Sequence, residues 1–322
     1  MSRAGLLGGG LAAVSALSLL CGLALGSFPI GIAGVVDSIV FPVPGVVHDI
    51  IWNLRAPRTF AAYACGGLLA LAGALLQVLL RNALADPYIL GVSGGASFGA
   101  LLALTFGAGA AAMNASAFVG AVAAIAIVFG LTYRSGDWNV YRLLLTGVVF
   151  SAGLSALISL ILVLAPEAQV KGMLFWLMGD LSQTDSAWPA WIVLSALVAL
   201  GTAGAMRLDL LSLGELKARS LGVAVGGLQL AVFAGAALAT VTAVVLGGAI
   251  GFIGLMAPHA IRLSGVSHHK ALLPLSVMLG GAVLTLADVA ARTAWAPQQL
   301  PVGILTAMLG VPAMLLLLAR QR

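Results

Sequence analysis

The sequence predicts an all-α integral membrane protein, and three observations lead to that fold class. Of 322 residues, 61% are hydrophobic and only 8% are charged, whereas a soluble domain carries about a quarter charged residues. The apolar runs are each about 17 to 25 residues long, enough for a helix to cross a bilayer. They lack the polar and apolar alternation of a membrane β-barrel. Because backbone polar groups in lipid must pair within a helix or a closed barrel, helices remain.

Apolar runs of this kind occur at ten places in the chain. They predict ten membrane-spanning helices, of which the eighth is the shortest. The predicted spans are 6–27, 59–80, 89–107, 115–133, 142–164, 188–206, 227–248, 250–264, 271–290 and 302–319.

Three of these spans have features of their own. We interpret 6–27 as the first membrane helix rather than a signal peptide, because it is long enough to cross and other spans follow. The third span contains Gly91, Gly94, Gly95 and Gly99, and such glycines allow close approach of a neighbouring helix. The eighth span contains Pro258 and His259, so we expect it to be buried against protein.

Basic residues predict which side each loop faces. Eleven of the 15 Lys and Arg residues lie at the chain ends or in loops on one side of the predicted spans, and four lie on the other side. Because basic loops stay in the cytoplasm, we expect both termini there. The outer four are Arg55, Arg58, Lys171 and Arg292.

Three connections are too long or too patterned for simple turns. Two are outer segments, 28–57 and 166–187. The third is the inner segment 207–222, where leucines flank a charged face and Glu215 precedes Arg219 by one helical turn. With Gly214 and Gly222 beside the charged run, it predicts one or two short cytoplasmic helices, and a solvated loop is the alternative.

The sequence gives little indication of nucleic-acid binding, a disulfide or a metal site. The basic residues are scattered singly, which does not suggest nucleic acid. Cys21 and Cys65 lie in apolar runs and are interpreted as packing residues. The four histidines have no spacing suited to a metal site. We therefore predict no metal, no cofactor and no catalytic residue.

Long motifs in this chain resemble those of a known family, the permeases of type II ABC importers for cobalamin, iron-siderophore complexes and haem (BtuC/FecCD-like). The resemblance covers nearly the whole chain. The motifs are RAPRTFAAYACGGLLALAGALLQVLLRNALADPYILGVSGGA, LGELKARSLGV, GGAIGFIGLMAPHAIRLSG, HHKALLPLS, LADVAAR and LPVGILTAMLGVPAMLLLL.

The resemblance implies a fold and a set of partners. It implies one permease domain over 1–322, with ten helices in which the second to fifth and the seventh to tenth are inverted repeats. Two copies would form the pathway in a bacterial inner membrane. Two ABC ATPase subunits would bind on the cytoplasmic side and a periplasmic binding protein outside. The substrate implied is a bulky metal chelate, cobalamin or another corrinoid first, then iron-siderophore or haem.

The resemblance also implies roles for three groups of residues. Arg55, Arg58 and Arg292 would receive acidic residues of the binding protein, although they could instead anchor helix ends at the lipid headgroups. Asn82, Leu84, Asn139 and Val140 would close a cytoplasmic gate, although a polar turn is the alternative, and Ala83 replaces the usual proline. The ATPase contact would be made by Leu213, Gly214, Glu215, Lys217, Ala218, Arg219, Leu221 and Gly222.

ATP hydrolysis would belong to a separate chain, because no GxxxxGK[ST] loop occurs in the sequence. A rival class is an ion-driven secondary carrier, which would need acids at mid-membrane. Asp288 alone comes close, and Arg292 four residues later favours a local ion pair over a proton relay. A third class is a membrane scaffold without transport activity.

Overall fold

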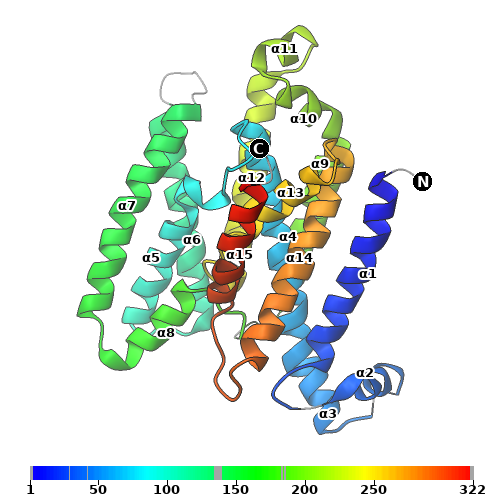
Figure 1. The fold of residues 1–322 in the computed structure, drawn as a ribbon. Helices are drawn as coiled ribbons and strands as arrows, with labels where there is room; N and C mark the ends of the chain where they lie inside the picture. Colours follow the sequence, from blue (N-terminus) through cyan, green and yellow to red (C-terminus); the bar gives the residue numbers. More distant parts are fainter. Residues whose placement is uncertain are drawn as a thin grey trace.

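The computed structural model describes residues 3–28, 30–41, 43–133, 140–182, 184 and 186–319. Within these residues the secondary structure is helical throughout (Figure 1). The helices of the first half are α1 (Arg3–Ala24), α2 (Gly31–Val40), α3 (Val46–Asp49), the π-helical turn η1 (Ile50–Arg55), α4 (Ala56–Leu79), the 3-10 turn η2 (Pro87–Leu90), α5 (Val92–Thr105), α6 (Ala110–Thr132) and α7 (Val140–Leu164).

The second half continues the same pattern of long and short helices. It comprises α8 (Glu167–Leu177), α9 (Trp188–Ala203), α10 (Ala205–Ser212), α11 (Glu215–Ser220), α12 (Val225–Gly247), α13 (Ile253–Leu263), α14 (His269–Thr293) and α15 (Val302–Ala319). The start of α1 and the end of α15 lie in the same half of the molecule as α10 and α11, whereas α2, α3 and α8 lie at the opposite end (Figure 1).

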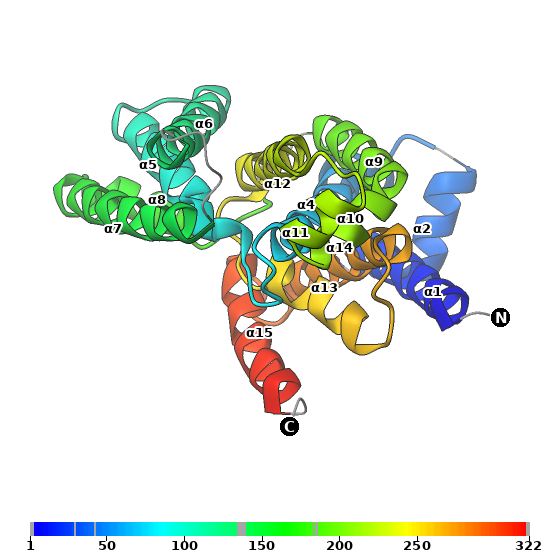
Figure 2. The same cartoon turned by 90° about the horizontal axis from the view of Figure 1, so that it is seen from above.

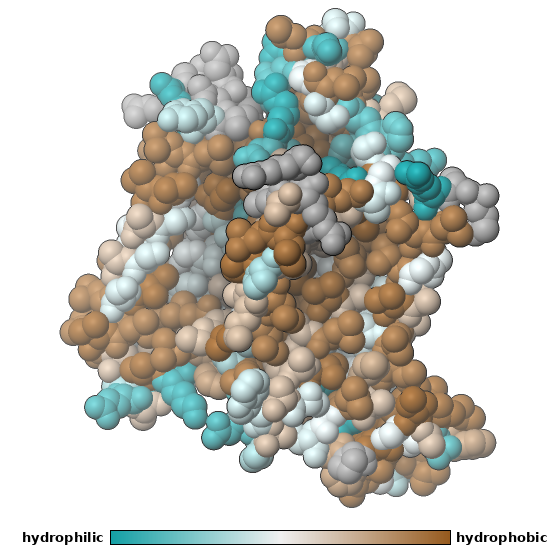
Figure 3. Space-filling view, in the orientation of Figure 1, coloured by the Kyte–Doolittle hydropathy of each residue, from teal (hydrophilic) through white to brown (hydrophobic). Residues whose placement is uncertain are grey.

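Helices occur at all of the predicted spans. Among the described residues, six helical segments are long and apolar enough to cross a membrane, and the bent pair α9 and α10 would make a seventh. α5 and the described part of α15 are apolar but shorter. Hydrophobic side chains cover most of the middle of the face in Figure 3, and hydrophilic ones gather toward the two ends. Both observations confirm the prediction of a helical membrane protein with several spans.

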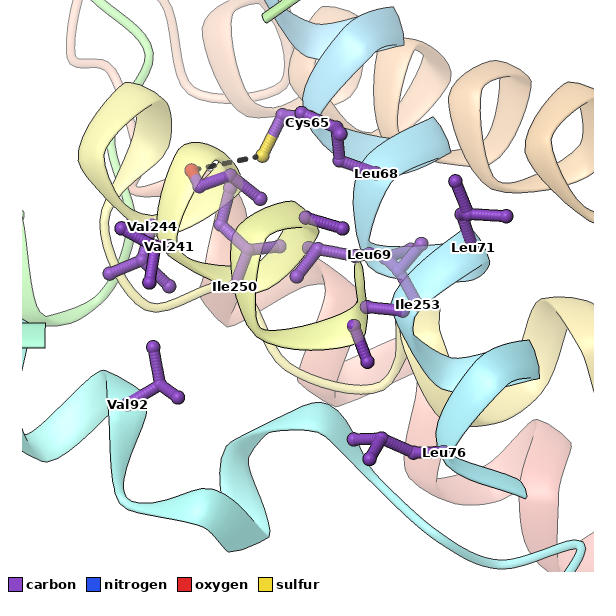
Figure 4. Close-up of a cluster of buried hydrophobic side chains, with 14 of the residues drawn as sticks. Cys65, Leu68, Leu69, Leu71, Leu76, Val92, Val241, Val244, Ile250 and Ile253 are labelled. Carbon is purple, nitrogen blue, oxygen red and sulfur yellow. Dashed lines mark hydrogen bonds between the residues drawn. The ribbon is translucent and has the colours of Figure 1, made fainter. Parts of the chain in front are cut away.

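Helix α4 is the centre of the core. Almost every residue of α4 is buried, and it packs against α12, α13, α14, α9 and α1. Figure 4 shows leucines of α4 facing Val241 and Val244 of α12 and Ile250 and Ile253 beyond it. Seen from above, α5 to α8 form a group on one side of this core and α1 lies on the other (Figure 2).

Small residues allow the closest helix contacts. A Cβ on Gly66 of α4 would lie 2.2 Å from the carbonyl oxygen of Gly280 in α14. A Cβ on Gly95 of α5 would lie 2.3 Å from the carbonyl oxygen of Gly120 in α6. The prediction that the glycine-rich third span approaches a neighbour is therefore confirmed, and that neighbour is α6.

The short eighth span is buried, as predicted. α13 has 11 residues, and Pro258 and His259 are among its buried ones. The break between α12 and α13 is held by Tyr88 of η2, whose hydroxyl accepts from the Ile250 N–H and donates to the Ile250 carbonyl, both at 2.9 Å. The Tyr88 side chain therefore connects η2, which precedes α5, to the segment between α12 and α13.

Two boundaries differ from the prediction. The second span was predicted to begin at 59, but helix runs continuously from Val46 to Leu79, and Pro57 lies in it directly after the π-helical turn η1. The sixth span was predicted as continuous from 188 to 206, but the chain bends by 66° between α9 and α10, at Gly204.

Candidate functional site

The three arginines expected at the outer face lie together at one end of the bundle. Arg55 ends η1, Arg58 is in the first turn of α4, and Arg292 is in the last turn of α14. All three are buried, with 5%, 8% and 6% of their surface exposed. Their partners within the chain therefore decide what these charges do.

Arg58 makes the strongest contacts of this cluster. Its Nε and Nη2 donate to Asp288 Oδ1 at 2.9 and 2.8 Å, and its Nη1 donates to Gln299 Oε1 at 2.7 Å. Asp288 is 1% exposed. A guanidinium and a carboxylate paired in this side-by-side geometry satisfy each other's charge and hydrogen bonds, which a buried ion pair requires.

The other two arginines tie helix α1 into the same cluster. Arg292 Nη2 donates to the Gly22 carbonyl at 2.6 Å, and Arg292 Nε lies 3.5 Å from Asp288 Oδ2. Arg55 Nη1 donates to the carbonyls of Leu23 and Ala24 at 2.9 and 2.7 Å. The predicted pairing of Asp288 with Arg292 is confirmed, although Arg58 is the closer partner.

At the opposite end, the 207–222 segment forms two short helices, as predicted. α10 and α11 are joined through Leu213 and Gly214, and Leu221 and Gly222 follow the end of α11 (Figure 1). Gly214 has φ of 105° and Gly222 has φ of 81°, a region that residues with a Cβ rarely adopt. Both glycines therefore set the direction of α11.

The charged face of α11 is connected to the ends of two long helices. Glu215 does not use Arg219 as its partner. Its Oε1 accepts from Gln229 Nε2 of α12 at 3.0 Å and lies 3.4 Å from Arg81 Nη2, just beyond α4. Lys217 and Arg219 are exposed. Glu215 thus fastens α11 to the ends of two long helices, which leaves the basic residues to solvent.

Helix α11 has a buried side and an apolar exposed side. Ala218 is fully buried in a small cluster with Val78, Leu211 and Val225. Leu213, Leu216 and Leu221 are 57%, 86% and 58% exposed. Leucines exposed at the tip of a segment that is otherwise polar are typical of a protein–protein contact.

The structure describes the side chains of two of the four predicted gate residues. Asn82 and Leu84 follow α4 and are exposed, and Asn82 Oδ1 accepts from the Leu84 N–H at 2.9 Å. That bond defines a polar turn, the alternative considered from the sequence. Asn139 lies outside the described residues, and Val140 begins α7 while its side chain is likewise outside them.

Sequence reasoning missed a second set of polar contacts near the α11 end. Gln77 is buried in α4, accepts from Arg262 Nη1 of α13 and donates to the Leu255 carbonyl at 3.3 Å. The sequence could have predicted these contacts, because a glutamine within an apolar span needs hydrogen-bond partners inside the bundle. Asp209 of α10 likewise bonds the His269 backbone N–H at 2.9 Å. Among the described residues, no three His, Cys, Asp or Glu side chains gather to hold a metal.

The bundle of apolar helices, with an exposed short helix at one end and a buried charge cluster at the other, defines a polytopic membrane protein. The sequence model of the FecCD transport family matches residues 14–320 of this chain. The chain belongs to the FecCD transport family, a family of membrane transport permeases.

Three relatives, two of them named for a substrate, share most of the chain. The hemin transport system permease protein HmuU of Yersinia pestis is 36% identical over 95% of this chain and 94% of its own. The vitamin B12 import system permease protein BtuC of Escherichia coli O9:H4 is 36% identical over 84% of each chain. The uncharacterized ABC transporter permease protein YvrB of Bacillus subtilis is 38% identical over 85% of this chain and 79% of its own.

A solved structure has the same fold along its whole length. A metal-chelate type ABC transporter in an inward-facing conformation aligns with a TM-score of 0.84 and 29% identity, covering 97% of this chain and 98% of that one. PsaBC from Streptococcus pneumoniae aligns with a TM-score of 0.57 at 16% identity, a likeness of fold alone.

Proposed function

We propose that this chain is the membrane-spanning permease subunit of an ATP-driven importer for a bulky metal chelate. Membership of the FecCD transport family supports this class. The observation that carries it in this chain is α11, a short helix set by two positive-φ glycines, fastened by Glu215 and presenting three leucines to solvent. Such a helix is rigid and accessible, the two properties needed to transmit force from an ATPase.

The proposed assembly follows the relatives. Two copies of the chain form the pathway, two ABC ATPase subunits bind α11 from the cytoplasm, and a periplasmic binding protein delivers the chelate outside. We place the complex in a bacterial inner membrane, with ten crossings, both termini cytoplasmic, and one permease domain over 1–322. The inverted repeat of the second to fifth and seventh to tenth helices belongs to the same proposal.

Alternating access would begin at α11. When ATP draws the motors together, residues 213–222 move with them. Glu215 passes that motion to Arg81 at the end of α4 and to Gln229 in α12, and two rigid arrangements of the helices then exchange. Asn82 and Leu84, beside Arg81, are placed to respond, and with Asn139 and Val140 they form the proposed cytoplasmic gate.

Docking of the binding protein at Arg55, Arg58 and Arg292 needs an added step. Each of these guanidinium groups already donates within the chain. An incoming carboxylate must therefore displace Asp288 or a backbone carbonyl of α1. We propose that docking exchanges these partners, which would couple arrival of the binding protein to the packing of α1, α4 and α14.

Cobalamin or another corrinoid is the first candidate substrate, with iron-siderophore complexes and haem as alternatives. The relatives include permeases named for vitamin B12 and for hemin. Reconstituted vesicles containing the chain, its ATPase and its binding protein would be tested for ATP-dependent uptake of each chelate. Uptake without the ATPase would instead support an ion-driven carrier, a class that the pairing of Asp288 with Arg58 disfavours.

The ATPase contact is tested by Leu216→Asp. Because Leu216 is 86% exposed, the variant should fold and insert normally. A buried charge at an interface anchor should weaken ATPase binding by at least about tenfold, equivalent to more than about 1.4 kcal/mol. Affinity would be measured by pull-down from detergent with purified ATPase. Ala224→Asp, an exposed position beyond α11, is the matched control. Equal affinities of the two variants would overturn the contact.

A further inference from the structure

A cleft at the end of the bundle away from α11 is not used by the proposed transport cycle. Its volume is about 1020 Å³. It is lined by the end of α5, the start of α6, α8, the start of α9 and the last turns of α12. Seen from above, α6, α9 and α12 lie on the opposite side of the molecule from α15 (Figure 2).

The lining of this cleft changes character along its depth. Its apolar walls include Phe118, Val193 and Leu238, which lie farther along α6, α9 and α12 from the end that carries α8. Leu238 and Leu246 both line it and are eight residues apart in α12, which corresponds to about 12 Å of helix. The cleft therefore extends inward along the helices, parallel to the direction of lipid chains.

Charged and hydroxyl groups gather at the mouth. Lys171 of α8 and Asp180 line it together with Ser182 and Ser186. Asp180 accepts from the Ser182 N–H and hydroxyl at 2.8 and 2.6 Å, which fixes the carboxylate in place. Among the described residues, no ion pair within 4 Å joins Lys171 to an acid. One positive and one negative group thus face the same opening.

An exposed tryptophan beside this mouth indicates its depth in the membrane. Trp188 begins α9, directly before the lining residue Pro189, and is 76% exposed. Tryptophan side chains collect at the level of the lipid headgroups. The polar mouth therefore lies at headgroup depth, and the apolar walls lie at the depth of the acyl chains.

We propose that this cleft binds a zwitterionic phospholipid with an ethanolamine headgroup. Lys171 takes the phosphate, Asp180 takes the headgroup ammonium, and the upper part of an acyl chain lies against Phe118, Val193 and Leu238. The two opposite charges at the mouth match in kind the two charges of this headgroup. An anionic lipid such as phosphatidylglycerol would satisfy Lys171 but would leave Asp180 facing its uncharged glycerol.

The proposal is tested with the purified chain in vesicles of phosphatidylethanolamine and phosphatidylglycerol. The probe is phosphatidylethanolamine carrying a photoactivatable diazirine on one acyl chain, and mass spectrometry maps the labelled residues. Labelling should concentrate on the cleft walls. Lys171→Glu should reduce it about five-fold, as expected for loss of one basic contact with a lipid phosphate, whereas Lys270→Glu, at the α10 end of the molecule, should not.

Two further arms identify the occupant. The same diazirine on phosphatidylglycerol should label the cleft several-fold less, and Asp180→Asn should remove that preference. Ala111→Trp, which fills the cleft from an exposed position without changing charge, should also abolish labelling and decides the matter if Lys171→Glu does not accumulate. Uniform labelling of all lipid-facing helices, or equal labelling of the Lys171 and Lys270 variants, would overturn the proposal. Displacement of the probe by a metal chelate would assign the cleft to the transport path.

Discussion

The two ends of this molecule use charge in opposite ways. At one end, Arg55, Arg58 and Arg292 are buried and donate to Asp288, Gln299 and carbonyls of α1. At the other end, Lys217 and Arg219 of α11 are exposed, and the helix is held by the polar contacts of Glu215 and the buried side chain of Ala218. The first arrangement fastens three helices to one another, and the second leaves a surface available to another chain.

The two ends differ in whether a binding partner must replace contacts that are already present. A buried ion pair cannot lose one member without leaving an unpaired charge in a low-dielectric region. A partner must therefore replace a contact at the arginine cluster in the same step in which it removes one. At α11 a partner only adds contacts. We accordingly expect substitutions in the cluster to act mainly on stability and substitutions in α11 to act mainly on transport.

The largest effect should come from Asp288→Asn. The variant leaves the buried Arg58 and Arg292 without a counter-charge, and breaking a buried pair costs about 3 to 5 kcal/mol. The measurement is thermal unfolding of the purified chain in detergent. Asp37→Asn removes an exposed acid from α2 near the same end and is the control. If both variants unfolded at the same temperature, the cluster would not stabilise the fold.

A smaller effect is expected for Gly214→Val. With φ of 105° at this position, a β-branched residue introduces backbone strain of about 1 to 3 kcal/mol, which the chain can relieve by turning α11. ATP hydrolysis by the assembled complex should continue while uptake falls. Gly226→Val, at a helical position of α12 with open space around it, should retain its uptake. A normal ratio of uptake to hydrolysis in the Gly214 variant would contradict a transmitting role for α11.

The smallest effect on stability should come from Arg81→Gln. The Arg81–Glu215 pair is partly exposed, at 46% and 29% for the two side chains, and such pairs contribute under about 1 kcal/mol. Thermal unfolding should therefore hardly change, while the yield of uptake per ATP declines. A large destabilisation would mean that the two ends do not differ in the way described.

The sequence was sufficient to predict most of the fold. Apolar length placed a helix at each predicted span, and the glycines of α5 and the proline in α13 indicated their burial correctly. It was also sufficient to predict short helices in the segment 207–222. These features depend on local composition, and local composition is what a single sequence displays directly.

Features that depend on distant partners could not be predicted in the same way. Arg58 looks like a surface cation next to a span, and its burial depends on Asp288, which lies 230 positions away. Glu215 has Arg219 at helical spacing but bonds Gln229 and Arg81 instead, because α11 turns that face toward α4 and α12. The cleft lined by Lys171 and Asp180 combines residues of five helices and had no local signal in the sequence.

The bend at Gly204 has a mechanical consequence. Because α10 leaves α9 at an angle of 66°, a displacement of α11 along the membrane normal does not act along the axis of α9. It applies a torque to α9 about Gly204 instead. A small movement of α11 can therefore tilt α9 and displace the end of α9 that lies away from Gly204.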